Sequence, residues 1–159
     1  MSATPLAAAL VDFVQGGVSV LVGSRDARLM PECARGISAR VENGAAEMTV
    51  FLPVETAAST LANLRDNGRI AVAFSHTDHH SVQVKGRVLG VHRAKPADRE
   101  WIERYRCALA HNWGVIGLPP RLTMRLAHWP CYAIRFRIES AFDQTPGPRA
   151  GGPLAEAVS

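Results

Sequence analysis

The chain has 159 residues, of which 47% are hydrophobic and 20% are charged, and its formal net charge is +4. This length fits one domain over residues 1–159, and the composition is that of an ordinary globular protein rather than a disordered or fibrous one. No apolar run approaches the roughly 20 residues that a membrane-spanning helix requires, so we expect no membrane segment.

Arginine carries nearly all of the positive charge, since sixteen arginines stand beside only two lysines. A GC-rich coding bias accounts for much of this excess and agrees with the abundant Ala, Gly and Pro. The arginines form no stripe and aromatic residues are few, which argues against nucleic acid as a partner. A small anionic ligand remains a candidate partner, because the planar guanidinium group suits phosphate and carboxylate.

The N-terminal stretch MSATPLAAALVDFVQGG predicts a surface helix at about residues 2–15. It lacks a basic segment and carries Asp12, so it does not resemble a signal peptide. The cysteines, Cys33, Cys107 and Cys131, are odd in number and form no Cys-x-x-Cys motif. This pattern indicates reduced thiols and a cytoplasmic location rather than disulfides or a zinc site.

Two-residue alternation of apolar side chains predicts six strands in the region 17–142. In chain order they cover residues 17–23, 36–42, 47–53, 69–74, 79–92 and 131–142. The turn Asn43-Gly44 predicts a hairpin between the second and third strands. Gly86 and Gly90 inside the fifth strand indicate a bend or a close backbone approach. The predicted fold class is mainly β, a small antiparallel barrel or sandwich of six strands.

Helical spacing predicts three further helices, over residues 54–68, 96–112 and, as a shorter turn, 119–129. The last strand is followed by TPGPRAGGP, which holds three prolines and three glycines. Proline stiffens an extended backbone, so we expect the C-terminal tail, residues 143–159, to lie in a fixed extended path over another part of the protein, with disorder beyond Leu154.

This order of elements, with the phrases LANLRDNGRIAVAF and SVQVKGRVLG, resembles the FMN-binding split-barrel family related to pyridoxamine 5'-phosphate oxidase. The resemblance covers roughly residues 17–90 and the last strand, and FDQTPGPRAG resembles the ending of an uncharacterised subgroup. It implies a six-stranded antiparallel split barrel with flanking helices and a homodimer. It also implies two FMN sites at the subunit interface, built from strand edges of one chain and loops or tail of the other.

The resemblance also implies candidate cofactor-binding residues. The family's Arg-x-x-x-x-Lys run falls on RGISAR, and its Ser-Arg-Lys phosphate clamp falls on Ala-Ser-Thr, where both cations are missing. The family's Arg-Gln pair before the fifth strand is here His-Ser, and the tail offers an amide and a hydroxyl. The predicted contacts with FMN are therefore Arg35, Ser38, Arg40, Ser59, Thr60, His80, Ser81, Gln144 and Thr145.

Arg35 and Arg40 lie five residues apart, which places them on opposite faces of a regular strand. The two arginines can contact one ligand only if the strand twists or bulges. The alternative, in which both arginines face solvent and bind no ligand, is equally compatible with the sequence. The HTDHH run (His76, Asp78, His79 and His80) lacks a fourth convergent ligand, so we expect a polar hairpin loop and no metal site.

The predicted function is an FMN-binding flavoprotein, an oxidoreductase acting on an unidentified small molecule, with no catalytic acid or base named. The oxidase's own Arg-Leu-His-x-Arg substrate motif is absent, so we do not expect oxidation of pyridoxamine phosphate. The alternative is a non-enzymatic split barrel that binds haem, a deazaflavin or another anionic ligand, or a dimer with no bound cofactor. The missing phosphate cations motivate this alternative.

Overall fold

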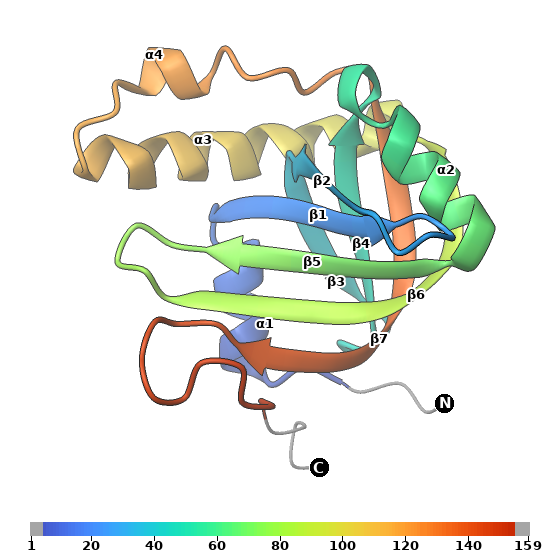
Figure 1. Cartoon of the computed structure of the whole chain (residues 1–159). Helices are drawn as coiled ribbons and strands as arrows, with labels where there is room; N and C mark the ends of the chain where they lie inside the picture. The colour runs from blue at the N-terminus through green and yellow to red at the C-terminus, as the bar shows by residue number, and fades with distance from the viewer. Residues whose placement is uncertain (1–4, 155–159) are drawn as a thin grey trace.

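The computed structural model describes residues 5–154 and is mainly β (Figure 1). Its elements are α1 (Ala8–Gln15), β1 (Ser19–Arg25), β2 (Pro31–Gly36), β3 (Ser38–Glu42), β4 (Glu47–Pro53), η1 (Val54–Thr56), α2 (Ala58–Asn67), β5 (Arg69–Ser75), β6 (Ser81–Arg93), η2 (Pro96–Asp98), α3 (Arg99–Val115), α4 (Pro120–Thr123) and β7 (Cys131–Asp143). The first helix begins at Ala8, later than predicted, and residues 1–4 lie outside the described residues.

One antiparallel sheet holds all seven strands in the order β2-β1-β5-β6-β7-β4-β3. Its two edge strands, β2 and β3, are consecutive in the chain and are separated by Ile37 alone. The Ile37 N–H donates to the carbonyl of Phe51 on β4 at 2.8 Å, so the chain passes at this residue from one end of the sheet to the other. The sheet therefore curls into a barrel that is split beside Ile37, which confirms the predicted fold class.

The strand count differs from the prediction, because the sequence indicated six strands and the structure has seven. The strand that the sequence analysis missed is β2, whose only buried residues are Ala34 and Gly36. Such small residues give no visible apolar alternation. Gly36 has to be small, since a Cβ there would lie 2.7 Å from a methyl group of Val20.

The two longest strands, β6 and β7, bend together and connect the two halves of the barrel. Their pairing shifts register between Lys85 and Gly86 and again between Val88 and Gly90. A Cβ on Gly86 would collide with the carbonyl oxygen of Arg137 and lie 2.7 Å from the Phe136 ring, whereas a Cβ on Gly90 would meet nothing within 4 Å. The predicted bend is confirmed, and the close approach occurs at Gly86.

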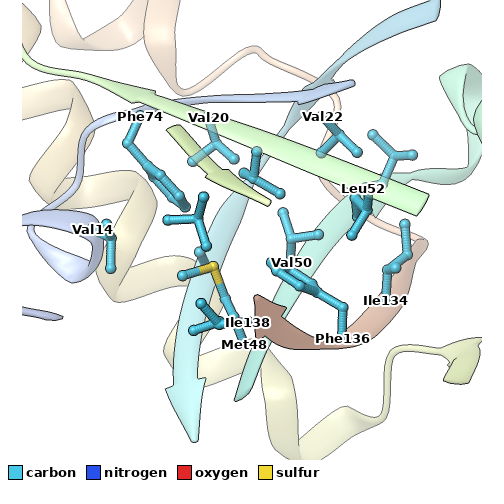
Figure 2. Packing of buried hydrophobic residues seen from close by; sticks show 14 of the residues in the cluster. Val14, Val20, Val22, Met48, Val50, Leu52, Phe74, Ile134, Phe136 and Ile138 are labelled. Atoms are coloured by element: carbon cyan, nitrogen blue, oxygen red, sulfur yellow. The ribbon is translucent and has the colours of Figure 1, made fainter. Parts of the chain in front are cut away.

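The core fills the inside of the barrel with the side chains that the alternation predicted (Figure 2). Val20 and Val22 on β1 lie opposite Phe74 and Val72 on β5, and Met48 on β4 lies opposite Phe136 on β7; all are at most 1% exposed. The β3–β4 hairpin is confirmed, with Glu42 opposite Glu47. The helix 54–68 divides into η1 and α2 and ends at Gly68, whose φ is +65°.

Helices leave one face of the sheet uncovered. In Figure 1 the outer side of β1, β5 and β6 faces the viewer, and no described helix lies in front of it. At the back, the Tyr105 hydroxyl on α3 lies 2.9 Å from the carbonyl oxygen of Val14 on α1, which joins these two helices. Within residues 5–154, no helix has both the length and the apolar character needed to cross a membrane.

Replacing Gly86 by alanine should destabilise the fold by about 2–4 kcal/mol, because the added methyl group meets backbone and ring atoms that cannot move aside. The matched change Gly90→Ala, on the same strand, should alter stability by less than about 0.5 kcal/mol, since its methyl group enters open space. Urea unfolding midpoints measure both. Equal midpoints for the two variants would show that Gly86 makes no close contact.

Candidate functional site

The uncovered side of β2, β1, β5 and β6, which we call the open face, carries the outward-pointing residues of these strands. On β1, Val20 and Val22 point inward and are buried, so Ser19 and Leu21 point outward. Strand pairing places Leu21 between Arg35 of β2 and Ala73 of β5. Residues that share a face and lie opposite one another are neighbours, so the pairing defines rows across the open face.

Three serines form one such row. Ser19 pairs with Ser75, and Ser75 pairs with Ser81. The Ser81 hydroxyl lies 3.2 Å from that of Ser75, and the Ser81 N–H donates to the Thr145 hydroxyl oxygen at 3.1 Å. At the other end, Arg35 Nη1 donates to Ser19 Oγ at 3.2 Å. We call Ser19, Ser75, Ser81 and Thr145 the hydroxyl row; the strands from β2 to β6 span about 14 Å.

Arg35 is a positioned cation whose charge is not neutralised. Its guanidinium lies 5.6 Å from the centre of the Trp113 ring and bonds to Ser19, both of which are neutral. No ion pair among residues 5–154 includes Arg35. An exposed guanidinium that is held by neutral partners is suited to bind a phosphate or a carboxylate.

The same face is hollowed beside the β1–β2 hairpin into an open groove of about 620 Å³. Gly23, Ala71 and Ser140 are among its small lining residues, and Cys33 and Lys85 lie at its walls. Ligand pockets for small molecules are roughly 300–1,000 Å³. The groove therefore has room for a ring system of the size of a flavin, but it stays open to solvent on one side.

A second space, which we call the arm cavity, lies between the bend at Ile37 and the segment from α3 to Ala127. Its volume is about 200 Å³. It is lined by Arg35, Gly36, Ile37, Pro53, Thr56, Arg106, Leu109, Thr123, Leu126, Ala127 and His128. A space of this size is too small to enclose a flavin.

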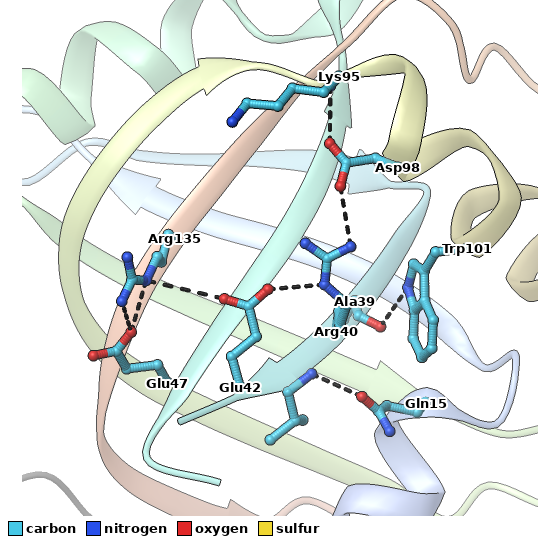
Figure 3. Close-up of polar contacts among 10 residues, drawn as sticks. Gln15, Ala39, Arg40, Glu42, Glu47, Lys95, Asp98, Trp101 and Arg135 are labelled. Atoms are coloured by element: carbon cyan, nitrogen blue, oxygen red, sulfur yellow. Dashed lines mark hydrogen bonds and ion pairs between the residues drawn. The ribbon is translucent and has the colours of Figure 1, made fainter. Parts of the chain in front are cut away.

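Arg40, the other predicted arginine, belongs to a different set of contacts (Figure 3). Its guanidinium binds Glu42 at 2.8 Å and Asp98 at 3.0 Å, and Asp98 also accepts the Lys95 N–H at 2.8 Å. Figure 3 shows this chain of contacts continuing from Glu42 to Arg135. Arg40 thus anchors η2 to β3, and the structure does not bring it together with Arg35.

The predicted residues of the helix clamp also separate. Ser59 is exposed on α2, whereas Thr60, one residue later, is fully buried. Ser38, at the start of β3, is buried as well. The hydroxyls of Ser38 and Thr60 have no hydrogen-bond partner among the described residues and do not reach the surface. These three side chains form no common site with the hydroxyl row.

The remaining predicted residues meet at the β5–β6 turn. The Gln144 N–H donates to the Ser81 carbonyl at 2.8 Å, and Thr145 contacts Ser81 through its hydroxyl. The His80 ring lies 4.2 Å from that of Phe13, and the Asp78 carboxylate accepts the His80 N–H. That backbone hydrogen bond, with His76 nearby, lowers the pKa of Asp78. The predicted polar loop is present, and residues 5–154 contain no group of three or more His, Cys, Asp or Glu that could hold a metal ion.

The prolines predicted an extended path for the C-terminal segment. The segment instead loops back onto β7. The Gly151 N–H donates to the Asp143 carbonyl at 2.7 Å, and the Leu154 N–H donates to the Ala141 carbonyl at 2.8 Å. Bonds from the hydroxyl and the N–H of Thr145 lower the pKa of the Asp143 carboxyl. The glycines at 147 and 151 have positive φ, which closes the loop. Residues 155–159, predicted to be disordered, lie outside the described residues.

Sequence reasoning missed Ser19 and Ser75. The alternation of buried Val18, Val20 and Val22 was the available signal, because it turns Ser19 outward. The row becomes visible only when the register is known, since Ser19 and Ser75 are 56 positions apart in the numbering (75 − 19) and become neighbours through pairing.

No family model and no curated protein matches the chain, but solved structures do. A candidate pyridoxamine 5'-phosphate oxidase from Lactobacillus delbrueckii has a TM-score of 0.55 and 14% identity, covering 87% of this chain and 93% of that chain. Group A Streptococcus HupZ has a TM-score of 0.54 and 18% identity, covering 92% and 99%. An FMN-binding protein from Syntrophomonas wolfei has a TM-score of 0.52 and 14% identity, covering 93% and 85%.

Identities this low show a shared fold alone. The chain has the split-barrel fold of the flavin-binding proteins related to pyridoxamine 5'-phosphate oxidase, as its sequence patterns indicated.

The thiols on α3 and β7 should differ sharply in reactivity. Cys107 is exposed, whereas Cys131 is buried, and burial together with the charge of Asp98 raises the pKa of Cys131 to about 11. Because the thiolate is the reactive form, iodoacetamide at pH 8 should modify Cys107 in the native protein and Cys131 only after unfolding. Peptide mass spectrometry identifies each site, and Cys107→Ser is the control. Equal rates at both residues in the native protein would contradict the burial of Cys131.

Proposed function

We propose that this protein is an FMN-binding homodimer that acts as an oxidoreductase on a small molecule. The observation that carries the proposal is the open face, where a hydroxyl row ends at a guanidinium without an acidic partner. The chain that carries this arrangement shares its fold with an FMN-binding protein from Syntrophomonas wolfei.

The residues of the open face fit the three chemical parts of FMN. Arg35 would hold the phosphate through charge-assisted hydrogen bonds. Ser19, Ser75 and Ser81 would meet the hydroxyls of the ribityl chain. The flat ring would extend from this row along β1 and β5 toward the groove that Gly23 and Ala71 line, where Gly23 lies four residues from Ser19 on β1. When bound, a flavin supplies the hydride or electron transfer, and the protein supplies binding, orientation and exclusion of water.

The phosphate would have fewer charged partners here than in the family pattern. Two cations of the clamp are missing, Ser59 is exposed and Thr60 is buried. Charge-assisted hydrogen bonds contribute roughly 1.5–3 kcal/mol each. We therefore expect a weaker complex with FMN than a complete clamp would form, with Arg35 as the main anchor of the phosphate.

The dimer follows from the shape of the site, because a ring on the open face would have one side in water. A second copy across this face would enclose the ring. Exposed apolar side chains lie on the β1–β2 hairpin, Leu29 and Met30, and at the C-terminal end of α3, Val115 and Ile116. In a dimer with a two-fold axis, the hairpin of each copy would pack against the end of α3 in its partner. The same two apolar surfaces would then meet twice, which makes the interface self-complementary.

A deazaflavin is the second candidate, because it shares a flat ring and an anionic end with FMN and would use the same residues. Haem is a poorer fit, since no histidine lines the groove to serve as an axial ligand. The absorption spectrum of the purified protein separates these three, because flavin, deazaflavin and haem absorb in different bands.

Replacing Arg35 by alanine should weaken FMN binding by roughly 10- to 100-fold, because the phosphate loses its charged partner. Arg28→Ala is the matched control, since Arg28 is an exposed arginine outside both the groove and the hydroxyl row. Quenching of FMN fluorescence on titration with protein measures the affinity. The assignment fails if the two variants bind FMN equally well.

Replacing Ala73 by glutamate should break the dimer, because it puts a carboxylate at the centre of the open face. Ala62→Glu is the control, since Ala62 is exposed on α2. Sedimentation velocity should show a dimer for the wild type and the control and a monomer for Ala73→Glu. A dimer in all three proteins would place the interface on another surface.

A further inference from the structure

The arm cavity is a separate space from the groove of the proposed flavin site, although Arg35 lines the cavity and is also the proposed anchor of the phosphate. It has a volume of about 200 Å³ and lies beneath the segment that follows α3. A protein cavity of about 150 Å³ with aliphatic walls is large enough to hold benzene. The arm cavity therefore has room for one six-membered ring with a small substituent.

The walls of the arm cavity are mainly apolar, with Ile37, Pro53, Leu109 and Leu126 among the lining residues. Apolar cavities hold water poorly, so an apolar ring that enters one displaces little bound water. The walls thus favour a ligand that is mostly hydrocarbon.

One of the two arginines that line the cavity, Arg106, has its partners within the wall. Arg106 is 6% exposed, and its guanidinium binds the Glu103 carboxylate at 2.7 Å and the Met124 carbonyl at 2.7 Å. His128 Nε2 lies 3.2 Å from the same carboxylate. Glu103 neutralises Arg106, and the other lining arginine, Arg35, places its guanidinium against Ser19 and Trp113, so neither arginine needs a charged ligand inside the cavity.

One polar group of the lining residues lacks a partner. The hydroxyl of Thr123, a residue that is 3% exposed, has no hydrogen-bond partner among the described residues. A buried hydroxyl without a partner costs stability, and rotation about χ1 exchanges the hydroxyl and methyl positions of threonine. A ligand with one hydroxyl group would supply the missing hydrogen bond.

We propose that the arm cavity is a binding site for a neutral, monocyclic molecule with a single hydroxyl group, of the class of phenol. The ring lies among the apolar side chains, and its hydroxyl bonds to Thr123. This site is additional to the flavin site and does not depend on it, because its walls come from one chain and its ligand carries no phosphate.

Phenol is the probe, and it is titrated against the full chain without added flavin, with binding followed by saturation-transfer NMR. A ligand of this size should bind with a Kd on the order of 0.1–1 mM. Leu126→Trp, which fills the cavity from its partly exposed wall, should weaken binding at least tenfold. Leu122→Trp is the control, because Leu122 is 42% exposed and does not line the cavity. Urea midpoints check that both variants fold.

Thr123→Val tests the hydrogen bond, because it keeps the shape and removes the hydroxyl. Phenol should then bind several-fold more weakly, while toluene should bind as it does to the wild type. The proposal is overturned if phenol shows no saturable binding, if Leu126→Trp binds it as well as Leu122→Trp, or if FMN displaces it. The first two results would leave the flavin proposal intact, and displacement by FMN would make the cavity part of the flavin site.

Discussion

The bend at Ile37 is the constraint on which the arrangement of this protein depends. It divides one continuous run of extended chain into β2 and β3, the two edges of the sheet, and so closes the barrel. Ile37 is held by its bond to Phe51 and by packing in the second buried cluster, with Ile102 of α3. Because the bend lies between Arg35 and Arg40, it directs one arginine to the open face and the other to Asp98.

The barrel supports a site on its surface more readily than one inside. The interior is filled by large side chains such as Phe74, Phe136 and Met48, each fully buried. The outer side of β1 and β5 carries Gly23, Ala71 and Ala73 instead, which leave the backbone close to the surface. Small residues on one face and large ones on the other are what a flat ligand, or a second sheet, needs for close contact.

Much of the fold could be predicted from the sequence, because burial on one side of a strand leaves a period of two that Val18, Val20 and Val22 show clearly. β2 could not, since Ala34 and Gly36 bury almost nothing. The site was less predictable, because it depends on register. Arg35 and Ser81 were predicted through the family resemblance, whereas Ser19 and Ser75 come to lie beside them only through strand pairing. Proline and glycine in the tail indicated a rigid backbone. The sequence did not indicate the path of the tail, because hydrogen bonds to the carbonyls of Asp143 and Ala141 set that path.

In the proposed complex, a flavin occupies the open face between two copies of the chain. Cys33 lines the groove on this face, whereas Cys107 is exposed elsewhere on α3. The most direct measurement is the rate at which each thiol reacts with iodoacetamide, followed by mass spectrometry, with and without saturating FMN. FMN bound on the open face should slow the reaction at Cys33 at least tenfold and leave the rate at Cys107 unchanged. An unchanged rate at Cys33 in the presence of bound FMN would contradict this placement of the flavin.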